Sequence, residues 1–129
     1  MTSSRPYLIR ALYEWIVDNG LTPYILVDIG KDGIDAPLEY ADNGKLVLNV
    51  APRAVRGLNV GNDFVSFNAR FGGTPRDVTV PVEAVMAIYA RENGQGMLFN
   101  ERDDGGEPPE GGPGGGQKGA GRPTLRVVK

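Results

Sequence analysis

Apolar residues near the start of the chain recur every three or four positions, the spacing of an amphipathic helix. The helix is predicted to begin at Pro6 and to stop at Asn19-Gly20, where a left-handed residue ends helices. Its main stripe contains Leu8, Ala11, Leu12, Trp15 and Ile16. Further apolar residues widen this surface beyond one core face, namely Tyr7, Ile9, Tyr13 and Val17. Two interpretations stay open: a deeply packed helix, or a homodimer formed through the spare apolar face.

After Thr22-Pro23 the period changes to that of β-strands. Residues 24–29 form a mixed β-branched run, and residues 30–33 have the composition of a turn. Residues 35–40 alternate between apolar and polar side chains. Residues 42–44, Asp-Asn-Gly, then favour a tight turn with positive φ, so residues 45–50 are predicted to pair back as the next strand.

A second β-rich stretch begins at residue 63. Residues 63–71 place Phe67, Ala69 and Phe71 on one face of a strand, with Ser66, Asn68 and Arg70 on the other. After Gly72-Gly73, residues 76–80 read as a further strand. Pro81 is predicted to open a second helix with a stripe of Val82, Val85, Met86 and Tyr89, capped at Asn93-Gly94, and residues 97–99 to add a short edge strand. The sum is an α+β, mainly β fold: two helices and a small antiparallel sheet bent into a partial barrel.

The last thirty residues differ in composition from the body. Residues 101–121 are mostly Gly, Pro and charged residues, which bury too little apolar surface to offset the entropy of ordering, so this stretch is predicted to be disordered. The chain then ends in the apolar and basic run Leu125, Arg126, Val127, Val128 and Lys129. Such a run can be an unremarkable terminus or a peptide that docks on a partner's groove or sheet edge. We therefore divide the chain into a body (1–100), a linker (101–121) and a docking peptide (122–129).

Charge and composition narrow the classes of function. The body carries 9 Lys and Arg against 11 Asp and Glu, which argues against general attraction to nucleic acid. The absence of Cys and His removes thiolate metal sites, the commonest general base and the usual ligands of catalytic zinc. Neither a run of 18 apolar residues nor a signal-peptide core is present. The composition therefore fits a soluble cytoplasmic protein that is not a conventional hydrolase, and we expect no metal or cofactor.

Two charged clusters remain as candidates. Asp28, Asp32, Asp35 and Glu39 form the densest carboxylate group, but their spacing matches no EF-hand loop, and turn or surface roles are favoured. A small body also leaves little room for the sugar cleft of a two-carboxylate glycosidase. The second cluster is a set of arginines that could form a basic patch for RNA, the alternative function: Arg53, Arg56, Arg70 and Arg76.

A set of motifs in the same order along the chain resembles the stringent starvation protein B family, a family of bacterial proteolysis adaptors. In the body these motifs are residues 5–8, 13–15, 18–19, 22–23, 67–71 (Phe-Asn-Ala-Arg-Phe) and 87–94 (Ala-Ile-Tyr-Ala-Arg-Glu-Asn-Gly). Residues 121–129 are similar to the family's tail that binds ClpX. The linker departs from the acidic tails of some relatives, because it is shorter and far richer in glycine.

The resemblance implies a homodimer of Sm-like bodies that associate through their first helices, with an interface at Leu8, Leu12, Trp15 and Ile16. It implies capture of proteins carrying the ssrA tag of trans-translation, and their delivery to the ClpXP protease through the N-terminal zinc-binding domain of ClpX. The adaptor itself performs no chemistry. The motifs place the tag groove at Phe67, Asn68, Ala69, Arg70 and Phe71, with walls from Tyr40, Asn49, Ala54, Met97, Leu98 and Phe99. For Phe67 and Phe71 a position in the core is the alternative. The docking residues would be Leu125 to Lys129, with Leu125 and Val128 as apolar anchors.

Overall fold

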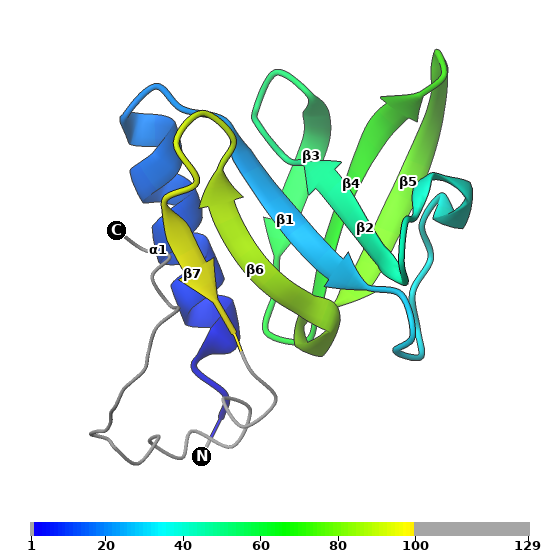
Figure 1. Ribbon diagram of the computed structural model, residues 1–129, viewed down its shortest axis with the longest axis horizontal. Coiled ribbons are helices and arrows are strands. Elements are labelled where there is room, and N and C mark those ends of the chain that lie inside the picture. The colour runs from blue at the N-terminus through cyan, green and yellow to red at the C-terminus, as the bar shows by residue number, and fades with distance from the viewer. Residues whose placement is uncertain (1, 100–129) are drawn as a thin grey trace.

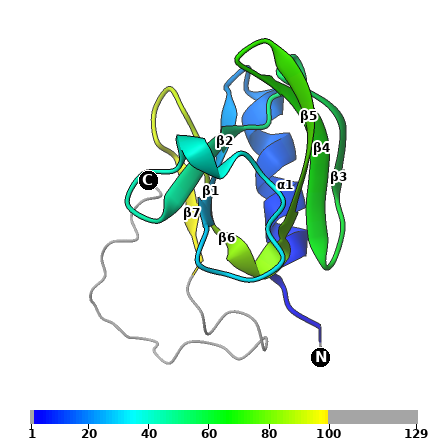
Figure 2. The same cartoon turned by 90° about the vertical axis from the view of Figure 1, so that its right-hand side faces the viewer.

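The computed structural model describes residues 2–99, which form two antiparallel β-sheets and one α-helix (Figure 1). The predicted linker and docking peptide lie outside the described residues. In Figure 2 the two sheets stand on opposite sides of the fold, with the helix between them. The elements, in chain order, are α1 (Arg5–Asp18), β1 (Pro23–Asp28), the 3-10 turn η1 (Leu38–Tyr40), β2 (Lys45–Asn49), β3 (Val55–Val60), β4 (Phe64–Phe71), β5 (Thr74–Pro81), the 3-10 turn η2 (Val82–Ala84), β6 (Val85–Ala90) and β7 (Gly96–Leu98).

The first helix forms where the apolar spacing predicted it. Pro6 lies in its first turn, and the chain leaves the helix through Asn19 and Gly20, whose φ is 75°. The amide of Leu21 donates to the carbonyl of Ile16 at 3.0 Å, which satisfies one of the carbonyls left open at a helix end. Ile9 and Ile16 are buried, so the helix faces the sheets with one side only.

The four-stranded sheet has the order β2-β1-β6-β7. The predicted turn before β2 is confirmed: Asn43 has a φ of 57° and Gly44 a φ of 77°. The partner predicted for β2 is wrong, because β2 pairs with β1, from Tyr24 opposite Asn49 to Asp28 opposite Lys45. Residues 35–40 form no strand. Pro37 has no amide to donate to a sheet, and the chain turns into η1 directly after it.

The predicted second helix is also wrong. Pro81 ends β5 and opens only the single 3-10 turn η2, after which the chain enters β6. β6 lies between β1 and β7, and Val85, Ile88 and Ala90 are completely buried. A short run that is apolar on both faces suits an inner strand as well as a buried helix. Here the pairing with β1 and β7 decides between them, and the predicted edge strand β7 is confirmed.

The three-stranded sheet has the order β3-β4-β5 and does not join the other sheet in a closed barrel. The mainly β character of the fold is thus confirmed, whereas a barrel is not formed and the Sm-like likeness stays a prediction. Sequence patterns missed β3, because its pairing with β4 shifts register between Arg56 and Asn59. Gly57, with a φ of 64°, lies in that irregularity and interrupts the alternation of side chains.

The hydrophobic core fills the space between the two sheets and α1. Val27 from β1, Val80 from β5 and Ile88 from β6 have no exposed surface, and Phe67 of β4 is only 4% exposed. Each such side chain contributes about 1.5–3 kcal/mol when it is fully buried. The core therefore fixes the inner face of β4 and, with it, the position of the residues at the end of that strand.

A buried arginine links three parts of the fold at one end of the core. Arg5 is 3% exposed, and its Nη1 donates to the carbonyls of Glu83 and Val85 at 3.0 and 3.1 Å. Its guanidinium also lies 5.3 Å from the ring centroid of Phe99. The first turn of α1, the start of β6 and the last described residue are therefore held together.

The turn between β6 and β7 contains a carboxylate with a low pKa, Glu92, which is bonded to the connection between α1 and β1. Glu92 accepts hydrogen bonds from the Thr22 hydroxyl at 2.6 Å and the Thr22 amide at 2.9 Å. These bonds, the hydroxyl first, lower the pKa of Glu92 from 4.5 to about 2. The lowered pKa stabilises the fold above the ordinary pKa of the carboxyl group, and this contribution is lost as the pH falls towards 2.

We expect Glu92→Gln to lower the melting temperature at neutral pH, with a difference from the unsubstituted chain that shrinks between about pH 4.5 and pH 2. Thermal unfolding followed by circular dichroism across this range measures the effect. Glu14→Gln is the matched control, because Glu14 is exposed on α1 and its carboxylate accepts no hydrogen bond from residues 2–99. A Glu92→Gln difference that is the same at pH 7 and pH 2 would contradict this role.

Candidate functional site

A concavity of about 290 Å³ lies where β3 begins beside β4. The pairing of Val55 with Ala69 and of Arg56 with Asn68 brings the segment before β3 against the second half of β4. Four residues predicted for the tag groove are brought together here: Ala54, Asn68, Ala69 and Arg70. The remaining lining residues are Arg53, Val55, Arg56 and Pro75.

Small side chains and arginines give the concavity its chemical character. Ala54 is half-buried and Ala69 is 8% exposed, so two methyl groups occupy positions that larger side chains would fill. Arg53, Arg56 and Arg70 are exposed beside them. Arg70 Nη1 donates to the carbonyl of Gly73 at 2.9 Å, whereas no ion pair among residues 2–99 engages Arg53 or Arg56. The concavity can therefore accept a narrow ligand that carries carboxylates or phosphates.

The polar groups on β4 are oriented by their neighbours. Asn68 Nδ2 donates to Asp77 Oδ1 at 2.9 Å, across the β4–β5 pair, and this fixes the amide of Asn68. Arg76, the fourth predicted arginine, is paired with Asp35 at 3.1 Å and does not line the concavity. Of the four arginines predicted to form a basic patch, Arg53, Arg56 and Arg70 therefore line the concavity, and Arg76 does not.

An aromatic pair continues along the same face of β4. Phe71 follows Ala69 by two positions, and its ring centroid lies 5.8 Å from that of Tyr40, which is 54% exposed. Asn49, at the end of β2, accepts a hydrogen bond from the amide of Ala51 at 2.9 Å. The amide of Ala54 in turn donates to the carbonyl of Ala51 at 2.8 Å, so Asn49 shapes the segment that leads into the concavity.

Two other groups of predicted groove residues lie elsewhere. Phe67 is a core residue at 4% exposure, because it points between the sheets from the middle of β4. Met97 and Leu98 belong to β7, at the edge of the other sheet, and Phe99 packs under Arg5. Arg5 bonds to Glu83 and Val85, which directly follow the end of β5. This end of β5 pairs with Phe64, and Phe64 lies five residues from Ala69 along β4. Met97, Leu98 and Phe99 are therefore not walls of the concavity.

The carboxylate cluster serves turns and the surface, as expected. Asp28 Oδ1 accepts the amide of Gly30 at 2.9 Å, and Asp35 pairs with Arg76 on the exposed side. Within residues 2–99 no group of three or more His, Cys, Asp or Glu side chains converges as metal ligands would. In the same part of the chain, no helix is long and apolar enough to cross a membrane.

The first helix divides between the core and the surface. Of the residues predicted for a dimer interface, Ile16 is 2% exposed and packs in the core, and Leu8 and Leu12 are partly buried against it. Trp15 is 47% exposed, and Tyr7 on the same helix is 53% exposed with Arg10 stacked 4.7 Å from its ring centroid. The helix is thus not deeply packed all round, and its exposed aromatic residues form a separate apolar surface.

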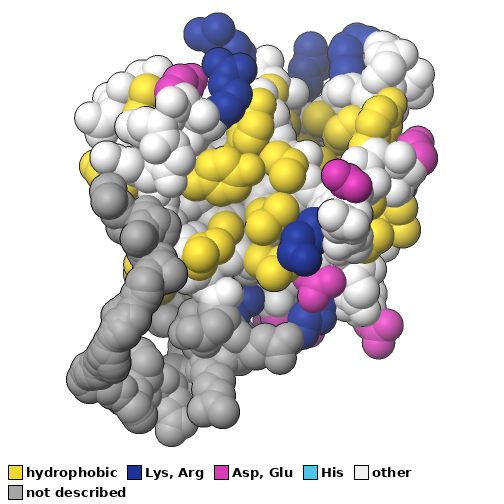
Figure 3. Space-filling model, viewed as in Figure 1, with side chains coloured by type: hydrophobic (Ala, Val, Ile, Leu, Met, Phe, Trp, Pro, Cys, Tyr) yellow, Lys and Arg dark blue, Asp and Glu magenta, His cyan; other side chains and the backbone are white. Residues whose placement is uncertain are grey.

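Hydrophobic side chains also gather over the outer face of the four-stranded sheet (Figure 3). The register places Val47, Leu26, Ala87 and Leu98 in one row across this face, and Val47 and Leu98 are 46% and 53% exposed. Tyr24 and Tyr89 pack edge to face with centroids 5.9 Å apart. Burial first, and then the neighbouring Tyr24, raise the pKa of Tyr89. Apolar faces of this kind are typical of association surfaces.

The fold is that of a small β-rich domain with a concavity formed on its three-stranded sheet. The chain belongs to the stringent starvation protein B family, since the sequence model of that family matches residues 3–129. It is also similar to a stringent starvation protein B homolog of Haemophilus influenzae, with 48% identity over 99 residues. The aligned part covers 77% of this chain and 66% of the relative, so the chain spans less than two thirds of that relative's length.

Proposed function

We propose that this protein is an adaptor of protein degradation that binds ssrA-tagged proteins and tethers them to ClpX, which enhances their degradation by ClpXP. Membership of the stringent starvation protein B family supports an adaptor role in general. The observation that carries the proposal is the concavity where Ala69, from the motif at residues 67–71, lies beside Ala54, a residue predicted for the groove wall. The protein would bind and position its cargo without chemistry of its own.

The concavity suits a peptide in an extended conformation. Alanines at positions 54 and 69 leave room for ligand side chains, and Asn68 and Arg70 offer directed donors beside them. Arg53 and Arg56, which pair with no carboxylate of residues 2–99, favour a peptide that carries acidic residues. Tyr40 and Phe71 extend the surface with an aromatic pair that can cover an apolar side chain of the tag.

The docking function is assigned to Leu125–Lys129 on sequence grounds. The family model extends over these residues, and they combine apolar anchors with basic charge. A glycine-rich chain of about 20 residues has a root-mean-square span of roughly 25 Å. Such a tether holds cargo beside its receptor at an effective concentration on the order of millimolar.

We further propose a cytoplasmic homodimer that uses the exposed aromatic side of α1. Trp15 and Tyr7 are the exposed aromatic residues, whereas Leu8 and Leu12 are partly buried and pack against the core. A dimer would carry two docking peptides, so that it could hold ClpX at two points and two weak contacts would add as avidity.

A titration of fluorescein-labelled ssrA peptide onto the full chain tests the proposed cargo site. We expect saturable binding with a Kd on the order of micromolar, about −8 kcal/mol, measured by fluorescence anisotropy. A peptide of the same composition in scrambled order is the control, because it keeps the charge and removes the sequence. The absence of saturation in the micromolar range, or equal binding of both peptides, would overturn the proposal.

An RNA ligand is the second candidate, because the same three arginines line the concavity. This alternative predicts an affinity that falls steeply with salt and does not depend on the last five residues. The same anisotropy assay with a fluorescent oligoribonucleotide at two salt concentrations separates the two candidates.

A further inference from the structure

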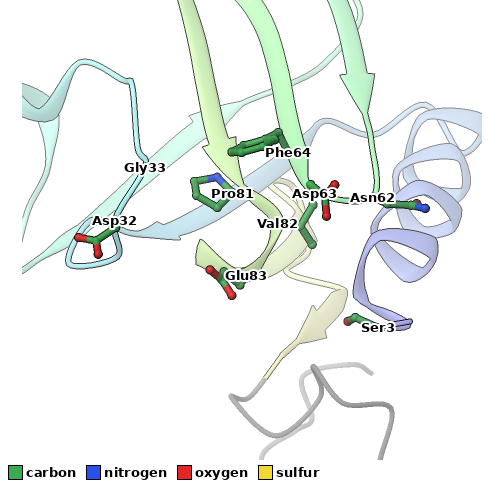
Figure 4. Close-up of a pocket in the computed structure, with 9 residues that line it drawn as sticks. All are labelled: Ser3, Asp32, Gly33, Asn62, Asp63, Phe64, Pro81, Val82 and Glu83. Carbon is green, nitrogen blue, oxygen red and sulfur yellow. The ribbon is translucent and has the colours of Figure 1, made fainter. Parts of the chain in front are cut away.

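A second groove, of about 520 Å³, lies at the opposite end of the three-stranded sheet from the concavity. Its floor is apolar: Phe64 is 50% exposed, lies opposite Pro81 in the β4–β5 pair, and is joined by Val82 (Figure 4). The loop that contains Gly33 packs onto Pro81, where a Cβ on Gly33 would lie 3.3 Å from the proline Cγ. The groove is thus a fixed apolar trough open to solvent.

Three carboxylates line this trough from separate parts of the chain. Asp32 comes from the loop after β1, Asp63 from the turn before β4, and Glu83 from η2 (Figure 4). All three are exposed, and no cation among residues 2–99 forms an ion pair with any of them. An occupant that combines apolar side chains with positive charge would therefore complement both the floor and the rim.

The chain itself carries such a segment, and it leaves the described fold beside this groove. Phe99, the last described residue, lies under the guanidinium of Arg5, and Arg5 donates to the carbonyl of Glu83 in the groove wall. Residues 113–129 contain four basic and no acidic residues, and their last five residues include Leu125, Val127 and Val128. Residues 101–110 have five carboxylates and share the sign of the groove, so they are not its occupant.

We propose that the groove formed by Phe64, Pro81, Val82, Asp32, Asp63 and Glu83 binds the basic C-terminal segment, residues 122–129, of the same chain. The 22 residues between Phe99 and Arg122 have a root-mean-square span of roughly 26 Å when they behave as a glycine-rich coil. The effective concentration of the segment is then on the order of millimolar, so an intrinsic Kd of about 1 mM occupies the groove about half of the time. This contact competes with the docking on ClpX, a consequence that rests on the proposed function, whereas the contact itself does not.

Paramagnetic relaxation in the full chain tests the contact directly. Because the sequence has no cysteine, Gly121→Cys gives a single site for a nitroxide label next to the basic segment. In the ¹⁵N-labelled protein at low salt, the amide signals of Asp32, Gly33, Asp63, Phe64 and Glu83 are expected to lose intensity severalfold relative to the reduced label. The loss should disappear near 1 M salt, where the Debye length is about 3 Å.

Charge-reversed variants separate a specific contact from chance proximity. Arg126→Glu with Lys129→Glu changes no residue of the described fold, and Asp63→Lys with Glu83→Lys changes only exposed side chains. Each pair should abolish the broadening, whereas Asp18→Lys, an exposed carboxylate at the far end of α1, should leave it unchanged. The proposed contact is wrong if the broadening is absent or persists in the tail variant. It is also wrong if broadening appears when a nitroxide-labelled chain without ¹⁵N is mixed with a ¹⁵N chain without nitroxide, because the contact would then be between two chains. Binding of an ssrA peptide is measured in a separate experiment, and its result does not depend on whether this contact forms.

Discussion

Replacing Ala69 with Gln is expected to weaken binding of an ssrA peptide by roughly 100-fold, or about 2.8 kcal/mol. Ala69 is 8% exposed and lies opposite Val55 in the β3–β4 pair, at the base of the concavity. Gln adds a methylene and a carboxamide at a place where the ligand needs space, and a central, desolvated position is where one residue affects binding most. Peptide titration by fluorescence anisotropy gives the fold-change.

The control for this substitution is Ser66→Gln, which introduces the same side chain three residues earlier on β4, at a position that does not line the concavity. It should bind the peptide like the unsubstituted chain. Thermal unfolding of both variants shows whether the loss comes from the fold, because Ala69 also contacts the core. A folded Ala69→Gln protein that binds the tag as tightly as the original chain would remove the concavity as the cargo site.

Deleting residues 125–129 is expected to abolish binding to the N-terminal domain of ClpX while leaving the affinity for the ssrA peptide unchanged. The deletion removes both apolar anchors, Leu125 and Val128, and two of the four basic residues of the distal tail. A short docking peptide has no other apolar contacts to replace them. Isothermal titration calorimetry with the isolated ClpX domain measures the loss.

Deletion of residues 112–116 is the matched control, because it also shortens the chain by five residues but leaves the docking peptide intact. Loop entropy changes slowly with length, so this variant should bind the ClpX domain like the full chain. Equal losses for the two deletions would indicate that length, and not the terminal sequence, determines docking.

Local sequence patterns predicted those elements in which the periodicity of apolar side chains and the residues at the ends indicate the same structure. α1 has regular apolar spacing and is followed by Asn19 and Gly20, and the turn before β2 contains Asn43 and Gly44 with positive φ. β4 alternates between buried Phe67 and Ala69 and the more exposed Asn68. In these segments the local preference and the tertiary environment favour the same structure.

The errors arise where pairing partners decide the structure. Val85–Ala90 has an apolar stripe that fits a helix, but its position between β1 and β7 makes it a strand. β3 was missed because the irregularity at Gly57 conceals its alternation, and β3 is the strand that brings Arg56 beside Asn68. Pairing between strands that are distant in the sequence cannot be predicted from the pattern of side chains in a short segment.

The candidate site was predicted in part for the same reason. Ala54, Asn68, Ala69 and Arg70 were selected by resemblance and gather at one concavity, whereas Met97 and Phe99 lie on the other sheet. The second groove was not predicted, because Asp32, Asp63 and Glu83 are far apart along the chain and carry no common motif. The pairing of β4 with β5 brings Asp63 and Glu83 to one end of the sheet, and the packing of the loop after β1 on Pro81 adds Asp32.

The rate at which ClpXP degrades an ssrA-tagged fluorescent protein, with and without this chain, tests the adaptor role most directly. At substrate concentrations well below the KM of ClpXP, the full chain should increase the rate severalfold, because tethering raises the local concentration of substrate. The chain without residues 125–129 should give no increase, although it binds the same substrate. An unchanged rate with the full chain, or an equal increase with the truncated chain, would contradict the account.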